Sequence, residues 1–188
     1  MKNLIGHFVT ITKHRHLVIK HCKKAGVLWQ GLRHDLSKYS PTEFWAGVRY
    51  FQGHRSPNAA EREDKGVSEA WMHHKGRNTH HYEYWQDNFD HGGEAKEMPW
   101  KYKVEMICDY LGAARAYMGK NFSYAAELEW WNNKMKQPRR QHFNDMAFVG
   151  RVLTQLAHEE KLNRTKESTD LLKYVLIVEK KRMYGENQ

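Results

Sequence analysis

The chain has 188 residues, a formal net charge of +9 at pH 7, two cysteines and thirteen histidines. This length suits one domain with a real core, and two distant cysteines argue against a sulfur-bound zinc site and suit a reducing compartment. No apolar run approaches the ~20 residues that span a bilayer, and the N-terminal segment becomes polar too soon for a signal peptide. We therefore expect a cytoplasmic protein that does not contact a membrane, and its positive charge favours anionic partners.

Almost every segment shows the apolar periodicity of a helix, which predicts an all-α fold. Residues 3–24 form one apolar stripe that ends before Gly26, and a shorter helix over 27–37 follows. The stretch "SPTE" at 40–43 has a capping serine, a proline at the first helical position and a glutamate three residues after the cap, so it starts a helix from Pro41 to about Phe51. The other predicted helices cover 59–75, 99–118, 123–136, 142–161 and 168–184, with a turn or short helix at 79–86 and loops at 53–58 and 90–99.

The predicted helix over 99–118 is apolar on nearly every side, as expected of a helix at the centre of a domain, yet it contains Asp109. At ~100° per residue, Asp109 shares a face with Tyr102, Met106 and Ala113. An unpaired carboxylate in such a place costs several kcal/mol unless a cation or several donors meet it. A metal ion would meet this carboxylate best.

The first predicted helix carries His7, His14 and His21 at seven-residue spacing. His14 and His16 lie on opposite flanks of the apolar stripe, roughly 90–110° from its centre, so geometry alone does not choose between them. We expect one of the His7, His14 and His21 trio to point along a seam between helices. A histidine that only forms a hydrogen bond at such a seam is the alternative.

His34 and Asp35 are adjacent, and neighbouring helical residues point ~100° apart. They converge on one ion only near a helix end or when the ion lies between helices, and the turn required before Pro41 supplies such an end. The stretch "HHKGRNTHH" adds two histidine pairs with a glycine-containing turn between them. Imidazole and carboxylate together suit Fe, Mn, Co, Ni or Zn, and these residues could hold one such divalent transition metal ion or two.

This order of residues resembles the HD superfamily of metal-dependent phosphohydrolases. Its H…HD…H…H…D series is similar to His14, His34-Asp35, His73 or His74, His80 or His81, and Asp109. The stretch "HDLSK" is similar to the HD-x-x-K signature of the cyclic-dinucleotide phosphodiesterase branch. That branch continues its HH motif into a glutamate and a "GYP" turn where this chain has "KGRNTHH", so its substrate is not carried over.

Longer stretches, "GLRHDLSKYSPTEFW", "HHKGRNTHHYEYW" and "MICDYLGAARAY", resemble a family of uncharacterised bacterial and phage proteins over about residues 10–135. The two resemblances imply an HD-like helical bundle over 1–120 that binds the metal and a C-terminal helical extension over 121–188 that packs on it. They also imply a first ion held by His14, His34, Asp35 and Asp109. One histidine of each later pair would hold a second ion or complete the shell.

The resemblance further implies hydrolysis of a phosphate ester, with a nucleotide-type substrate, by a water whose pKa the ion lowers from ~15.7 toward ~7. Lys38 would neutralise phosphate charge or give a proton to the leaving oxygen, and Glu105 would orient a ligand or water. Asp35 and these two residues form the expected catalytic set. The candidate substrate contacts are Arg33, Lys75 and Arg77 for phosphate and Tyr82 and Trp85 for a base, with surface charge and core packing as the alternatives.

Two other functions compete with hydrolysis. HD-type folds with two irons can activate oxygen, and a histidine-rich shell is compatible with such a redox protein. The basic surface is compatible with a non-enzymatic protein that binds nucleic acid, although no recognition motif supports this function. The oligomeric state is not specified by any of these patterns.

Overall fold

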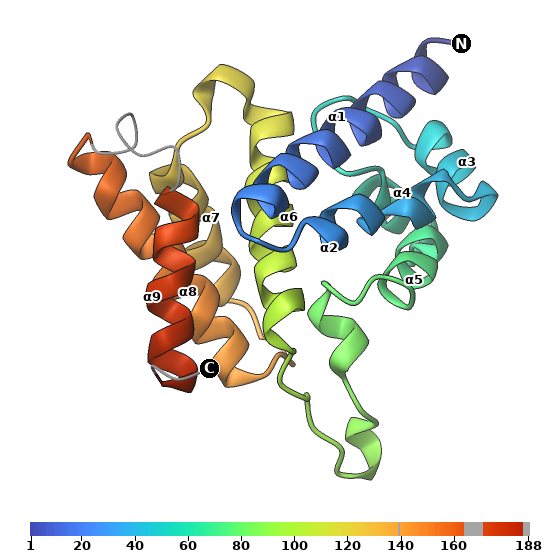
Figure 1. The fold of residues 1–188 in the computed structure, drawn as a ribbon. Helices are drawn as coiled ribbons and strands as arrows, with labels where there is room; N and C mark the ends of the chain where they lie inside the picture. Colours follow the sequence, from blue (N-terminus) through green and yellow to red (C-terminus); the bar gives the residue numbers. More distant parts are fainter. Residues whose placement is uncertain (139, 164–170, 186–188) are drawn as a thin grey trace.

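The computed structural model describes residues 1–138, 140–163 and 171–185 (Figure 1). Secondary structure in these ranges is helical and contains no strand, which confirms the predicted all-α fold. The α-helices are α1 (Lys2–Lys24), α2 (Leu28–Arg33), α3 (Pro41–Arg49), α4 (Pro57–Lys65), α5 (Glu69–Lys75), α6 (Trp100–Met118), α7 (Tyr124–Met135), α8 (Phe143–Lys161) and α9 (Leu171–Tyr184). The 3-10 helices are η1 (Leu36–Tyr39), η2 (Tyr82–Trp85), η3 (Phe89–His91) and η4 (Gly119–Asn121). No helix within the described ranges is both long and apolar enough to cross a membrane.

Helix α6 lies between two groups of helices (Figure 1). On one side α1 packs along α6, α2 packs on α1, and α3 contacts α1, α4 and α5. On the other side α7 packs on α8, and α8 packs on α9. The central position of α6 explains why its sequence is apolar on nearly every side, because both groups bury part of its surface.

A single apolar core includes residues from both groups of helices. Val18 of α1, Leu111 of α6, Trp131 of α7, Phe148 of α8 and Leu176 of α9 all belong to it and are almost fully buried. This core crosses the predicted boundary between 1–120 and 121–188. The division into a metal-binding bundle and an extension therefore stays a prediction about function, while the packing is continuous.

Two predicted helix boundaries are wrong. The predicted helix over 59–75 is two helices, because Gly66 adopts the left-handed conformation with φ 77° and ends α4. Ser68 then caps α5 by accepting a hydrogen bond from the Trp71 backbone N–H at 3.0 Å. The predicted helix over 27–37 ends at Arg33, and the chain continues into η1 only after His34 and Asp35.

Residues 168–170 of the last predicted helix lie outside the described residues.

A buried ion pair joins the central helix α6 to the group formed by α7, α8 and α9. Lys103 of α6 is fully buried, and its ammonium lies 3.2 Å from Asp145 Oδ1 of α8 and also contacts Glu97. The Met98 backbone N–H donates to Asp145 as well, at 3.2 Å from Oδ2. The start of α6 is therefore held to α8 by charge as well as by apolar contacts.

Candidate metal centre

Helices α1 and α6 bring His14 and Asp109 together at the side of the core. His14 Nε2 lies 3.1 Å from Asp109 Oδ1 and 3.3 Å from Asp35 Oδ2. His34 Nε2 lies 3.3 Å from His14 Nε2, 3.3 Å from Asp35 Oδ2 and 3.5 Å from Asp109 Oδ1. We call His14, His34, Asp35 and Asp109 the first donor group, and it unites four residues that the sequence predicts as ligands.

His34 and Asp35 converge because the chain leaves helical geometry at this point. Helix α2 ends at Arg33, His34 has the extended angles φ −53° and ψ 129°, and Asp35 is left-handed with φ 55° and ψ 22°. Aspartate tolerates this conformation better than most residues. Both side chains turn inward as a result, and their exposed fractions are 1% and 2%.

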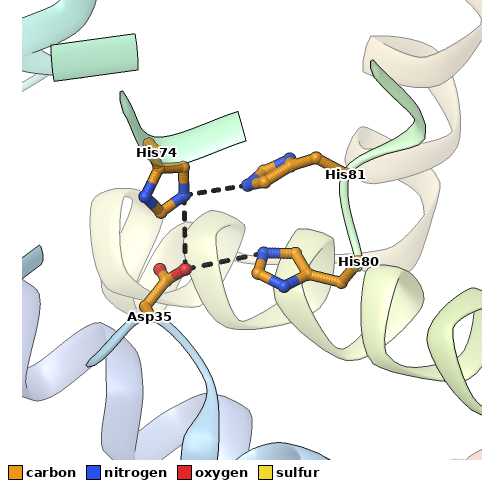
Figure 2. Close-up of side chains that lie close together, drawn as sticks. All are labelled: Asp35, His74, His80 and His81. Carbon is orange, nitrogen blue, oxygen red and sulfur yellow. Dashed lines mark hydrogen bonds and ion pairs between the residues drawn. The ribbon is translucent and has the colours of Figure 1, made fainter. Parts of the chain in front are cut away.

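A second donor group consists of Asp35, His74, His80 and His81. Figure 2 shows the His74 and His80 imidazoles facing Asp35, whose Oδ1 lies 3.3 Å from His74 Nε2 and 3.5 Å from His80 Nε2. His81 Nε2 lies 2.9 Å from His74 Nε2. The end of α5 therefore supplies one histidine, and the segment before η2 supplies two.

Asp35 belongs to both donor groups and presents a different oxygen to each. Oδ2 faces the first group and Oδ1 faces the second. Within the described chain, neither oxygen nor His80 Nε2 forms a hydrogen bond of acceptable geometry, although all three atoms are buried. Lys38 Nζ forms an ion pair with Oδ2 at 2.6 Å. Buried polar atoms of this kind call for a further partner, and a cation between the donors would supply it.

The spacing of the donor atoms suits shared metal ions. Two atoms that each lie ~2.1 Å from one ion are about 3.0–3.4 Å apart. Contacts among the donors fall close to that interval, at 3.1, 3.3 and 3.5 Å within the first group and at 2.9, 3.3 and 3.5 Å within the second. These buried groups could therefore hold metal ions.

Two glutamates orient the imidazole rings through contacts with their Nδ1 atoms. Glu105 Oε1 accepts from His34 Nδ1 at 3.0 Å and lies 3.2 Å from His80 Nδ1. Glu43 Oε2 accepts from His74 Nδ1 at 2.7 Å. A proton held on Nδ1 leaves the Nε2 lone pair free, and Nε2 is the atom that each ring turns toward the donor groups.

The protein field at the site favours positive charge. Burial alone would raise the pKa of Asp35, but His34, Lys38 and His74 hold this pKa well below its ordinary value. Burial would lower the pKa of His34, but Asp35, Asp109 and Glu105 raise it well above the ordinary value. The carboxylates that stabilise a proton on His34 would also stabilise a metal cation.

Two of the later histidines, His80 and His81, have lowered pKa values. Burial, together with the neighbouring His80 and His74 rings, lowers the pKa of His81 well below its ordinary value. Burial and His34 lower the pKa of His80. Neutral imidazole is the form that binds a metal ion, so the lowered pKa values favour the ligating form of these two residues.

Two cavities lie beside the donor groups. The first, which we call the Trp71 cavity, has a volume of about 190 Å³ and is lined by Lys38, His14, His74, His81 and Asp109 and by apolar residues that include Ile11, Phe51, Trp71 and Tyr117. The second, which we call the Arg33 cavity, has a volume of about 260 Å³ and is lined by Trp29, Gln30, Arg33, Arg77, Asn78, Thr79, His80, Lys101, Tyr102 and Glu105. His14 and Asp109 of the first group, together with Lys38, therefore line the Trp71 cavity.

Some predicted site residues lie elsewhere. The structure brings His74, and not its neighbour His73, into the second donor group. The His73 ring lies outside this group, with its Nδ1 bound to Glu43 Oε1 at 2.7 Å. Lys75 lines neither cavity. Arg33 and Arg77 line the Arg33 cavity and do not reach the Trp71 cavity.

The two predicted stacking aromatics pack against the core. Tyr82 and Trp85 contact the apolar core cluster, and Trp85 Nε1 donates to the Thr79 carbonyl at 2.8 Å. Neither residue lines a cavity beside the donor groups. Their rings are used for packing, which the helical spacing of the aromatics already offered as the alternative.

Sequence reasoning missed Glu43 as a site residue. The "SPTE" pattern assigned it to the start of a helix, and Ser40 does accept from the Glu43 backbone N–H at 3.5 Å. Its side chain instead turns inward to His73 and His74, and its exposed fraction is 6%. A glutamate on the buried face of α3 was the only signal available, and it carries no information about a partner more than thirty residues away.

Comparison with known proteins places the chain in a family but gives no activity. No match was found among curated proteins or among solved structures. A family model described as a family of unknown function, DUF5662, matches residues 4–155. This match spans α1 to α8 over most of its length, including every residue of both donor groups. The chain therefore belongs to the DUF5662 family.

Proposed function

We propose that this protein is a metal-dependent phosphohydrolase whose two divalent ions share Asp35. The observation that supports the proposal is that Asp35 directs Oδ2 to one buried donor group and Oδ1 to another. Each group then offers four ligand atoms, of which at least two are imidazole nitrogens. A mixed set of imidazole and carboxylate suits Fe, Mn, Co, Ni or Zn better than Mg or Ca.

The ligand order along the chain is the second support. The HD series to which the sequence is similar runs from His14 through His34-Asp35 and the later histidines to Asp109, and the donor groups contain these residues. Ions bound there would lower the pKa of water to make a nucleophile and would polarise the oxygens of a phosphoryl group. The activity itself follows from this chemistry and from the likeness to the HD series.

Lys38 is suited to bind the phosphate of a substrate. Its side chain lines the Trp71 cavity and is 29% exposed, so a substrate can reach it. Burial would lower its pKa, but the Asp35 and Asp109 carboxylates outweigh burial and raise the pKa. A lysine that keeps its charge neutralises phosphate, and this role is favoured over donation of a proton to the leaving oxygen.

The Trp71 cavity suits a small ester. Ile11, Phe51, Trp71 and Tyr117 give it an apolar wall, while the donor groups and Lys38 form its polar side. One phosphate can lie at the polar side with an apolar or aromatic group against the wall. We therefore expect a substrate such as a nucleotide or another phosphate ester with a compact organic group.

The test is elemental analysis of the purified protein together with turnover of p-nitrophenyl phosphate and bis-p-nitrophenyl phosphate. The wild-type protein is expected to retain about two ions per chain. Asp35→Asn, which keeps the shape but removes the shared charge, is expected to lose both ions and the activity. Asp90→Asn is the matched control, because Asp90 is exposed and lies in η3, outside both donor groups.

Three results would contradict the proposal. Equal metal content in wild type and Asp35→Asn would show that the ions are bound elsewhere. Two irons whose visible absorption bleaches on reduction, without phosphate release, would favour the redox protein. Retention on DNA or RNA that falls with salt but survives removal of the metal would favour the nucleic-acid-binding protein.

A further inference from the structure

The Arg33 cavity carries positive charge that the proposed reaction does not use. Arg33, Arg77 and Lys101 line it, and none of them forms an ion pair with a carboxylate of the described residues. The Arg77 side chain donates to the His73 carbonyl at 3.4 Å, and Lys101 Nζ lies 4.8 Å from the centre of the Tyr102 ring. Glu105 is the one carboxylate that lines the cavity, and it forms no ion pair with these three cations. The cations therefore outnumber the carboxylate around the cavity and attract an anion.

Cations in two other places that can be compared with this cavity are paired with carboxylates. Lys38 contacts Asp35 at 2.6 Å in the Trp71 cavity, and Arg151 contacts Glu179 at 2.6 Å in a cavity between α8 and α9. The difference is not explained by exposure alone, because Arg55 is exposed and is still paired with Glu63 at 2.6 Å. The Arg33 cavity therefore differs from these places because its three cations form no ion pair with a carboxylate of the described residues.

The Arg33 cavity shares two residues with the metal centre. His80 and Glu105 line the cavity, and the same residues belong to the metal centre. Glu105 uses Oε1 for both His34 and His80, and Oε2 has no hydrogen bond to a described residue. The Arg33 and Trp71 cavities share no lining residue, so a ligand in one is separated from the other by the imidazole rings.

We propose that the Arg33 cavity is a second anion site that binds the phosphate of a small phosphorylated molecule, separate from the phosphate that is hydrolysed. Arg33, Arg77 and Lys101 supply the charge, and arginine suits phosphate because its planar guanidinium donates two parallel hydrogen bonds. The volume of about 260 Å³ admits a phosphate with a small organic group. Trp29, which is 65% exposed, and Tyr102 offer aromatic faces for that group.

Binding of inorganic phosphate, measured by isothermal titration calorimetry at constant ionic strength, tests the site directly. The double variant Arg33→Gln and Arg77→Gln is expected to weaken phosphate binding at least about tenfold, because it removes two charge-assisted contacts. Both side chains are exposed, so the fold does not depend on them. Lys75→Gln is the matched control, since Lys75 is a nearby cation that lines neither cavity, and it is expected to bind as the wild type does.

A third variant separates this site from the proposed active site. Lys38→Gln removes the cation of the Trp71 cavity, so it weakens any phosphate binding there, and it is expected to leave unchanged the binding that the double variant removes. The inference is overturned if wild type shows no phosphate binding, if Lys38→Gln abolishes it, or if the double variant binds as wild type does. None of these results depends on turnover, so failure of the hydrolase proposal and failure of the anion site are distinguished.

A short oligonucleotide serves as the final probe. If the Arg33 cavity is a site for a single phosphate, inorganic phosphate is expected to bind there without a longer chain of phosphates. Oligonucleotide affinity that rises steadily with length, with no measurable binding of phosphate itself, would assign the three cations to a nucleic-acid surface and overturn the small-molecule site.

Discussion

Individual carboxylates determine which atoms the histidines present. Glu105 and Glu43 each hold imidazole Nδ1 atoms from outside the donor groups, and Asp35 lies between the groups. The sequence identified Asp109 as an unusual acid in an apolar helix and proposed Glu105 as a residue that orients a ligand or water. It could not identify Glu43, because a buried partner distant in sequence leaves no local pattern.

Glu127 of α7 is a buried carboxylate that makes the free energy of unfolding depend on pH. Its exposed fraction is 5%, and burial, with a contribution from Asp109, raises its pKa from 4.5 to about 7. The folded protein therefore holds this proton to higher pH than the unfolded chain does. The free energy of unfolding falls as pH rises between these two values, and this loss is complete above about 7.

Glu127→Gln removes this fall in the free energy of unfolding, because glutamine stays neutral at every pH. The variant is expected to be more stable than wild type by about 3 kcal/mol at pH values above the raised pKa, with the two proteins nearly equal near pH 4.5. Urea unfolding of both proteins at the two pH values measures this difference. A gain of the same size at both pH values would show that the charge of Glu127 is not its cause.

The contact between α1 and α6 is the element-level feature that places His14 beside Asp109. Gly112 of α6 lies against α1 so closely that an added Cβ would be 2.6 Å from Val18 Cγ2 and 3.3 Å from the Val18 backbone nitrogen. Helix α6 can therefore approach α1 only without a side chain at this position. The approach sets the separation of the two ligands, which are 3.1 Å apart.

Gly112→Ala is expected to lower stability by roughly 1–3 kcal/mol and to weaken metal binding, because α1 must move away from α6. Gly150→Ala in α8 is the control, since its Cβ would meet Trp131 Nε1 at an ordinary 3.5 Å. The control is expected to gain up to about 1 kcal/mol from helix propensity. Urea unfolding and competition with a chelator measure the two effects, and equal behaviour of the two variants would contradict the argument.

Helical periodicity predicted the elements well where a stripe was long, as in α1, α6 and α8. It failed between α4 and α5, where Gly66 and Ser68 break a polar stretch that has little apolar pattern to mark its ends. Helical periodicity also could not predict the left-handed conformation of Asp35. The sequence required a helix end near His34 and Asp35, but the backbone angles that turn both side chains inward depend on the packing of α1, α2 and α6.

At the scale of the whole molecule, the ion pair between Lys103 and Asp145 ties the central helix α6 to the group formed by α7, α8 and α9. Lys103→Met leaves Asp145 buried without its cation and is expected to cost about 3–5 kcal/mol. The double variant Lys103→Met and Asp145→Leu removes both charges and is expected to cost less. Urea unfolding measures both, and a larger cost for the double variant would contradict a role for charge.

The continuous core leads to an expectation about cooperativity. Because Leu111, Trp131 and Phe148 belong to one cluster, the protein is expected to unfold in a single transition for each of the variants above. The predicted ranges 1–120 and 121–188 would then differ in function and not in folding.

The burial of acidic residues makes the surface of the protein more positively charged. Seven carboxylates are buried among the described residues, namely Asp35, Glu43, Glu61, Glu105, Glu127, Asp145 and Glu179, whereas Lys103 is the only lysine or arginine buried there. The solvent therefore meets a more cationic exterior than the overall value of +9 indicates. Cell extract will coat such a surface with polyanions at low ionic strength, so a salt wash must precede any claim that a co-purifying RNA is a physiological ligand.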